Sequence, residues 1–371
     1  MRALRVLSVS ALLLCLVLPG PAQAQGRRRR GRGKSGQRQK DKGPRVSSLA
    51  TIYLRQGRPL RKVSVREAGH DVVKYKERGR STQEIKAERV REIRFLRAPG
   101  HYSSGLSKYR AGQFEKAAEA FALARSTAPE KSWVWPFSTY WLGQSKLMAG
   151  DAAGAAKEFQ ALLSKHAEHF LAPAALYGLG QAQSAQGKAS QAEATFAKLD
   201  EGYGDYWRAR AALGAGDAAL AAKNATKARG HYQKAEGRAS RYPEIRQAAQ
   251  VGIGKSYVLS KAYDRAIEYF EGIINSSGSD PEVAAHAWVG KGDCLYAKAE
   301  AKRGDPALLK QALIAYQTCS VRYAGVPEAY PKALYQAGRI YERLGLAKLA
   351  EAQRRELKTR CPSTSWAAKL K

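Results

Sequence analysis

The stretch GLSKYRAGQFEKAAEAFALARSTAP, residues 105–129, carries the pattern that decides the fold. Gly105 is followed a dozen residues later by the small residue Ala117, then by Phe121 and Ala124. Residues three and four apart lie on the same face of an α-helix, so the last three form an apolar stripe on one helix. Glycine at position 105 lets a preceding helix approach that stripe closely. The stretch therefore predicts a helical hairpin.

The same four-point pattern occurs seven times along the chain, and its glycines lie 36 to 46 residues apart. These motif glycines are Gly105, Gly143, Gly180, Gly216, Gly254, Gly292 and Gly338. A period of this length indicates a stack of equal supersecondary units rather than one globular core. We predict a mostly α fold, in which residues 99–371 form an α-solenoid of about seven hairpins.

The residues of this pattern resemble the tetratricopeptide repeat family, whose unit is a helix–turn–helix of about 34 residues. The resemblance weakens at Gly292, where an extra stretch, residues 300–310, is expected to separate the two helices. It weakens again at Arg354, which stands where the aromatic residue is expected.

A finer resemblance lies in the segments between hairpins. The sequence RCPSTSWAA at residues 360–368 is similar to the linkers of bacterial envelope tetratricopeptide proteins. Examples of that group are the Tol–Pal-associated cell-division coordinator and a lipoprotein of outer-membrane barrel assembly. The lipid-bearing cysteine of the lipoprotein is missing here. The resemblance implies an envelope protein that coordinates other proteins.

The first 24 residues have the composition of a secretory signal peptide. A basic start is followed by an apolar run from Val6 to Leu18 and by small residues up to Ala24, which is the order of a cleaved export signal. The run is shorter than the roughly 20 residues of a membrane span, and an uncleaved anchor is the alternative. We expect the mature protein to be periplasmic or secreted.

Positive charge is concentrated after this signal. The chain has a formal net charge of +32, and residues 25–46 hold ten basic residues against one acid. The candidate anion-binding residues are Arg27, Arg28, Arg29, Arg30, Arg32 and Lys34. A segment with so few apolar residues is predicted to be disordered. We predict that it tethers the protein to an anionic membrane surface or polymer; the alternative is a soluble spacer.

Residues 47–98 change to a period of two, with polar, glycine-containing turns between short apolar segments. This alternation predicts five short antiparallel strands in a small β-domain, loosely similar to SH3-like or Sm-like barrels. Its outward positions are rich in arginine and lysine. They predict either an anion-binding face or a solvated outer face whose charges protect strand edges.

No constellation typical of an enzyme is found. The sequence GIGKS at residues 252–256 lacks the upstream glycine of a P-loop and falls inside a repeat helix. His166 and His169 have no third ligand nearby. A bond between Cys294 and Cys319 is one reading, and buried thiols are the other. We predict a protein without catalytic activity, cofactor, metal or small-molecule substrate.

The remaining candidate is a peptide-binding surface. In the tetratricopeptide family the first helix of each hairpin lines the concave face, which implies a groove near each motif glycine. The predicted groove residues are Tyr102, Tyr140, Gln144, Tyr177, Gln181, Lys255, Tyr335 and Arg339. Asp217 and Asp293 also directly follow a motif glycine. Tyrosine offers a large contact area and a hydroxyl group, although some of these tyrosines could instead pack between hairpins.

These observations favour an exported scaffold that binds a protein or peptide partner on its concave face in the cell envelope. The alternative function is binding of an anionic polymer, such as peptidoglycan, another glycan or nucleic acid, through the basic tail and the β-domain. The export signal makes nucleic acid the less favoured of these polymers.

Overall fold

The computed structural model describes residues 49–276, 278, 280–326, 328–362 and 364–370. The predicted signal peptide, residues 1–24, and the predicted basic tail, residues 25–46, lie outside the described residues. Both therefore stay predictions. Within the described part of the chain, no helix has both the length and the apolar composition that crossing a membrane requires.

A small antiparallel sheet of five strands comes first in the described chain, as predicted. The strands are β1 (Leu49–Leu54), β2 (Leu60–Ala68), β3 (Val72–Lys76), β4 (Thr82–Lys86) and β5 (Val90–Phe95). Their order is β4-β3-β2-β1-β5, and a short 3-10 helix, Ala87–Arg89, joins β4 to β5. The closer likeness to SH3-like or Sm-like barrels stays a prediction.

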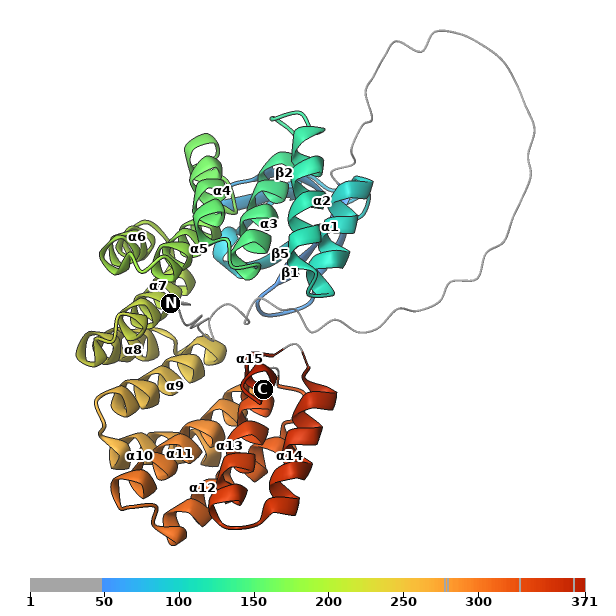
Figure 1. Cartoon of the computed structure of the whole chain (residues 1–371). Helices are drawn as coiled ribbons and strands as arrows, with labels where there is room; N and C mark the ends of the chain where they lie inside the picture. The colour runs from blue at the N-terminus through green and yellow to red at the C-terminus, as the bar shows by residue number, and fades with distance from the viewer. Residues whose placement is uncertain (1–48, 277, 279, 327, 363, 371) are drawn as a thin grey trace, which may run out of the picture. The chain divides into compact units, whose positions relative to one another are not determined.

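The remaining elements are helices, shown in Figure 1. They are α1 (Gly100–Arg110), α2 (Phe114–Ser126), α3 (Val134–Met148), α4 (Ala152–Lys165), α5 (Ala172–Ala185), α6 (Ala189–Gly202), α7 (Asp205–Ala221), α8 (Ala225–Arg238), α9 (Pro243–Leu259), α10 (Tyr263–Asn275), α11 (Pro281–Ala301), α12 (Pro306–Arg322), α13 (Ala329–Arg343), α14 (Ala347–Arg360) and α15 (Ser365–Ala368). The pairs from α1–α2 to α13–α14 form seven hairpins, the number that the glycine period predicts. In each pair the odd-numbered helix is called the first helix below.

The described chain divides into two compact units, residues 49–178 and residues 179–370, with the division inside α5. The sheet and the hairpins α1–α2 and α3–α4 belong to the N-terminal unit. The helices α6 to α15 belong to the C-terminal unit. The predicted boundaries at residues 24, 46 and 98 are not tested by this division.

The sheet is part of the core of the N-terminal unit. Its alternating apolar residues, such as Ile52 and Val63, are fully buried, as period-two patterning requires when one face is covered. At the end of β5, Phe95 stacks on Trp133, with ring centroids 3.7 Å apart. Phe95 also meets Phe137 of α3 edge-on. These aromatic contacts attach the sheet to the helices.

A second contact joins the sheet to the loop between α4 and α5. Gly69, in the β2–β3 turn, forms an isolated antiparallel bridge with His169. The N–H of His70 donates to the carbonyl of Glu168 over 2.9 Å, and the N–H of Phe170 donates to the carbonyl of Ala68 over 2.8 Å. The backbone of this loop thus continues the hydrogen bonding of the sheet.

One aromatic ring packed between two helical glycines recurs in the hairpins. Phe270 of α10 lies against Gly254 of α9 and against Gly290 of α11. A Cβ at either glycine would lie 2.5 Å or less from the ring, closer than any real contact allows. Phe159 meets Gly143 and Gly178 in the same way, and Tyr232 meets Gly216 and Gly252. The motif glycine was predicted to allow close helix approach; the second glycine, two residues before the next motif glycine, was not anticipated.

The repeat at Gly292 accommodates its extra residues by longer helices. The prediction that residues 300–310 separate the two helices is wrong, because α11 continues to Ala301 and α12 begins at Pro306. Asp305 caps α12 by accepting hydrogen bonds from the N–H groups of Ala307 and Leu308, and proline at the first helical position loses no helical hydrogen bond. The connection therefore stays short.

Candidate functional site on the first helices

Three of the predicted groove tyrosines are interior residues. Tyr102, Tyr140 and Tyr177 are only 3–4% exposed. Tyr102 meets Phe121 of its own hairpin and Trp133, both edge-on. The prediction that these three tyrosines offer a free surface is wrong, and the alternative that they pack between hairpins holds. A large ring on the inner side of a closely packed helix pair is buried by its neighbour.

The fourth tyrosine is half-buried and already has an aromatic neighbour. Tyr335 of α13 lies 5.3 Å, centroid to centroid, from Trp366 of α15. Arg339 stacks its guanidinium over Tyr335 at 6.0 Å and over Tyr296 at 5.4 Å. The final short helix of the described chain thus occupies the surface that Tyr335 was predicted to offer. Arg339 itself is exposed.

The predicted glutamines are better placed for contact with a partner. Gln144 and Gln181 are half-buried, each one residue after a motif glycine. The side-chain amide of Gln144 donates to the hydroxyl of Tyr140 over 3.3 Å. Both residues belong to first helices, but the division between the two units separates them, and they are not treated as one site.

Ionisable side chains gather instead on the first helices of the C-terminal unit and, at Glu328, directly before α13. The helices α7, α9, α11 and α13 pack against one another in that order. We call the following six residues the charged row: Asp217, Lys255, His286, Asp293, Glu328 and Lys332. All six are half-buried. Lys332 of α13 forms an ion pair with Asp293 of α11.

Tyrosines of the second helices hold the two aspartates in place. The hydroxyl of Tyr232 donates to Asp217 over 2.8 Å, and the hydroxyl of Tyr316 donates to Asp293 over 2.8 Å. Each of these tyrosines is also the ring that packs on the motif glycine of its hairpin. Each tyrosine therefore packs its ring in the core and, through its hydroxyl, orients the aspartate on the first helix.

This pairing follows the repeat sequence. Where the aromatic residue is tyrosine, as in the Gly216 and Gly292 repeats, the motif glycine is followed by aspartate. Where it is phenylalanine, the following residues are not acidic: they are Leu106, Gln144, Gln181 and Lys255. A carboxylate half-buried at this position needs a donor, and tyrosine supplies one where phenylalanine cannot.

Burial shifts the pKa of several side chains in the charged row. It raises the pKa of Asp217 to about 6, although the hydrogen bond from Tyr232 and the charge of Lys255 lower it. Burial also lowers the pKa of Lys255. It lowers the pKa of His286 to about 3, with further lowering by the charges of Lys255 and Lys332. Burial disfavours each charged form, so the imidazole of His286 is neutral at pH 7.

Sequence reasoning found only part of this row. It placed Lys255, Asp217 and Asp293 near the groove but missed Glu328, and it also missed His286 and Lys332. A signal was present, because His286 and Asp293 are seven residues apart, two helical turns along one face. Lys332 likewise precedes Arg339 by seven residues. Extending the motif two turns toward the start of each first helix would have identified them.

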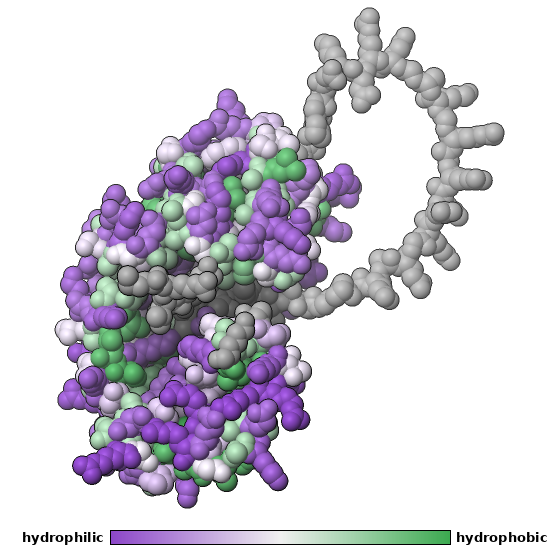
Figure 2. All heavy atoms as spheres, viewed as in Figure 1, coloured by the Kyte–Doolittle hydropathy of each residue, from purple (hydrophilic) through white to green (hydrophobic). Residues whose placement is uncertain are grey.

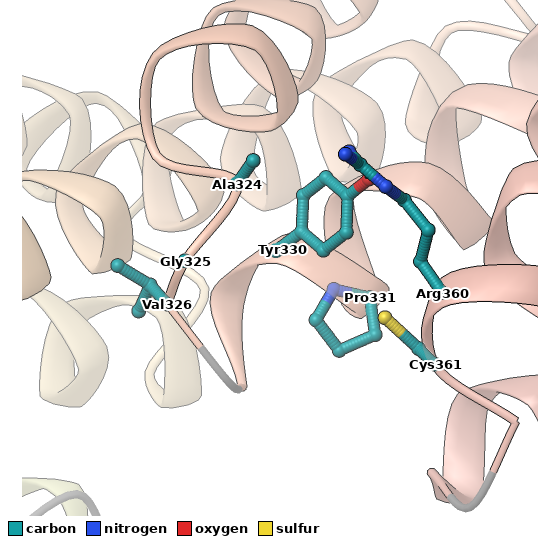
Figure 3. Close-up of a pocket in the computed structure, with 7 residues that line it drawn as sticks. All are labelled: Ala324, Gly325, Val326, Tyr330, Pro331, Arg360 and Cys361. Atoms are coloured by element: carbon teal, nitrogen blue, oxygen red, sulfur yellow. The ribbon is translucent and has the colours of Figure 1, made fainter.

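A hollow of about 590 Å³ lies at the end of the C-terminal unit, between the α12–α13 loop and the end of α14 (Figure 3). Its walls include Val326, Tyr330, Arg360 and Cys361. Arg360 donates to the hydroxyl of Tyr330 over 3.0 Å, and that hydroxyl donates to Glu356 over 2.6 Å. The polar groups at its rim thus bind one another.

Cysteines and metals give no further site among the described residues. Cys294, Cys319 and Cys361 are free thiols, and burial raises the pKa of Cys294 and of Cys319 to about 12. Neither thiol therefore has thiolate character at pH 7. Among the described residues, no group of three or more metal-ligating side chains is found.

A family model for the tetratricopeptide repeat matches residues 102–167 and 140–206. The hairpins of this stretch are therefore tetratricopeptide repeats, and the glycine–aromatic packing continues the same arrangement through α11–α12. The chain thus contains tetratricopeptide repeats over residues 102–206, and a small β-sheet precedes them.

Several solved structures are similar to this chain at low identity. A tetratricopeptide repeat protein from Parabacteroides merdae has 13% identity and a TM-score of 0.48, with 73% of this chain and 95% of that chain covered. The quorum sensor NprR from B. thuringiensis has 14% identity and a TM-score of 0.48, covering 73% and 79%. PilF from Pseudomonas aeruginosa has 18% identity and a TM-score of 0.42, covering 63% and 96%.

These likenesses are too distant to carry a conclusion about function. No curated protein sequence matches the chain.

Proposed function

We propose that this protein is an exported, non-catalytic scaffold of the cell envelope that holds an extended segment of a partner protein on the charged row. The observation that carries the proposal is the fixing of Asp217 and Asp293 by tyrosine hydroxyls 2.8 Å away. Charges held in position before binding lose little side-chain entropy when a partner arrives. Export is supported by the composition of residues 1–24.

The sign of the charge alternates between successive first helices. Asp217 lies on α7, Lys255 on α9 and Asp293 on α11. Packed helices lie roughly 10 Å apart, and an extended chain advances about 3.4 Å per residue. A partner segment that crosses these helices would therefore meet a new charge about every third residue. The complementary pattern is basic, then acidic, then basic, at that spacing.

Partial burial strengthens this recognition. The side chains of Asp293 and Lys332 are 25% and 27% exposed, so they can be reached but are poorly hydrated. Charges in such surroundings interact more strongly than on an open surface. A partner with the wrong charge order would place like charges together, and this repulsion provides specificity. Figure 2 shows hydrophilic side chains over most of the visible surface of the described residues, which agrees with recognition by charge.

The test uses a peptide array in which basic, acidic and neutral residues are permuted at three positions, each three residues apart. The full chain should bind the basic–acidic–basic order best. Exchange of Lys255→Glu should shift the preferred central residue from acidic to basic, with about tenfold weaker binding of the original peptide.

Lys310→Glu, the matched control, changes an exposed residue on second helix α12 and should leave the preference unaltered. Binding without any positional charge preference, or the same response to both exchanges, contradicts the proposal.

A further inference from the structure

A second charged surface lies on the β-sheet, in the N-terminal unit. The strand pairing brings the end of β1 beside the start of β5, where Leu54 is paired with Val90. The N–H of Arg55 donates to the carbonyl of Arg89 over 2.9 Å, and its guanidinium donates to the carbonyl of Glu88 over 2.8 Å. Two segments about 35 residues apart in the sequence therefore place arginines side by side.

The basic rim is the name used here for Arg55, Arg58, Arg89 and Arg91. Arg89, the last residue of the 3-10 helix, and Arg91, the second residue of β5, flank the buried Val90 and are both exposed. Arg58 is exposed in the β1–β2 turn. Arg91 also lies 5.9 Å from the ring of Tyr53. Four guanidinium groups thus share one end of the sheet.

Two other cations of the sheet are neutralised by neighbours. Lys74 lies 3.0 Å from Glu67 and 3.9 Å from Glu84. Arg94 pairs with Glu92 at 3.0 Å.

The rim differs from these sites. Among the described residues, Arg58, Arg89 and Arg91 form no ion pair with an acidic side chain. The rim arginines therefore contribute to the excess charge of this region, which has 14 basic against 6 acidic residues between positions 47 and 98.

We propose that the basic rim binds a linear chain of phosphate groups, independently of the peptide site on the charged row. Arginine presents a planar fork of donors that matches phosphate oxygens, and it keeps its charge at every physiological pH. All four rim cations are arginine. A polyanion with closely spaced charges can engage several of them and release its counterions, which drives binding.

Other polyanion carriers fit the rim less well. No large apolar side chain between residues 53 and 95, all of them described, is exposed, so the rim has nothing to insert into a membrane. The ring of Tyr53 is covered by the guanidinium of Arg94 at 4.8 Å, and a covered ring offers no platform for stacking nucleic-acid bases. The feature that the rim can recognise is therefore the negative charge of the phosphate groups.

The test measures binding of long-chain inorganic polyphosphate to the full chain by fluorescence anisotropy of a labelled polymer. The rim variant, Arg89→Gln with Arg91→Gln, should bind about tenfold more weakly and with a shallower dependence on salt. Arg58→Gln with Arg89→Gln is a second rim variant and should behave alike.

The matched control is Lys76→Gln with Arg78→Gln, which removes the same charge from exposed residues of β3 and the β3–β4 turn. It should weaken binding less than about threefold. All variants keep the basic residues 27–45, so that only the rim differs.

Circular dichroism and thermal unfolding should show that each variant is folded as the parent is. An equal loss in rim and control variants would mean that net charge alone binds the polymer, and it would overturn the proposal.

Three further probes are run with the parent and the rim variant: oligothymidylate, poly-L-glutamate and vesicles of phosphatidylglycerol with phosphatidylcholine. Polyphosphate should show the largest difference between the two proteins. A larger difference with any of the other three would assign the rim to bases, carboxylates or a lipid surface and would overturn the phosphate-chain proposal.

Discussion

The α9–α10 hairpin and the α13–α14 hairpin carry the same motif glycine but differ in what packs on it. In the first, Phe270 fills the space between Gly254 and Gly290. In the second, Arg354 replaces the aromatic residue, and a Cβ at Gly338 would meet its nearest neighbour at a comfortable 3.6 Å. Arg354 is half-buried and pairs with Glu342. A glycine is thus required only where a ring from another helix rests on it.

The largest effect on stability is predicted for loss of the aromatic ring of Phe270. Replacement of Phe270 by alanine should lower the free energy of unfolding by about 4 kcal/mol, because a fully buried ring is lost and a cavity is left between two glycine-lined helices. Arg354→Ala, at the equivalent position, should cost less than about 0.5 kcal/mol, since it removes a partly exposed ion pair. Urea denaturation of both variants measures the difference, and similar costs would contradict the account.

Replacement of a glycine by alanine should have the next largest effect on stability, and the effect should differ between the two hairpins. In Gly290→Ala, the new Cβ would lie 2.4 Å from the ring of Phe270, and the overpacked core should cost about 3 kcal/mol. Gly338→Ala has room for its methyl group and should gain up to about 1 kcal/mol from helix propensity. Thermal unfolding should therefore move in opposite directions for the two variants. A shared direction would show that ring contact is not the constraint.

The tyrosine–aspartate pair should give a smaller and pH-dependent effect. Tyr232→Phe keeps the ring but removes the donor to Asp217, with an expected cost of about 1.5 kcal/mol at pH 8. Because the folded pKa of Asp217 is raised to about 6 from 3.8, its carboxyl is mostly protonated in the folded protein near pH 5. The cost should shrink there, since a neutral carboxyl needs the donor less. A cost that is equal at pH 5 and pH 8 would show that the hydroxyl does not act through the carboxylate.

Near neutral pH the smallest predicted effect concerns His286. Its folded pKa of about 3 lies below the ordinary value of 6.5, so the unfolded chain binds the extra proton between these two values. Stability should therefore fall as pH drops through 6.5 toward 3, and it should be unaffected above pH 7.5.

The variant His286→Gln lacks this imidazole, so its loss of stability between pH 8 and pH 6 should be smaller than the parent's by about 0.8 kcal/mol, and by more at pH 5. Unfolding midpoints between pH 5 and pH 8 test this; a difference that does not change with pH would contradict the buried neutral imidazole.

Local patterns were enough to predict the helical hairpins and the strands. The recurrence of glycine, small residue and aromatic reflects a 3.6-residue period, and the segment around Ile52 and Val63 reflects a period of two. These periods are properties of neighbouring residues, so they are visible without the fold. The left-handed turns at Gly112 and Gly150, with φ of 71° and 89°, are local in the same sense.

The candidate sites could be predicted only in part. Tyr102, Tyr140 and Tyr177 occupy the expected repeat position, yet each is covered by residues of other helices. Lys255 was placed correctly on a first helix, but its neighbours His286 and Lys332 lie on α11 and α13. The basic rim depends on the pairing of β1 with β5. These spatial neighbours cannot be read from the sequence, because they depend on contacts between residues far apart along the chain.

The sequence by itself determined which segments become helices and strands, and how many hairpins follow one another. It also determined that a tyrosine accompanies each aspartate that follows a motif glycine. The tertiary structure alone decided which rings are covered, which carboxylates are desolvated and which arginines meet at one end of the sheet. The physical reason is that secondary structure depends on contacts a few residues apart, whereas burial and electrostatic fields depend on whatever the packed chain brings within a few ångströms.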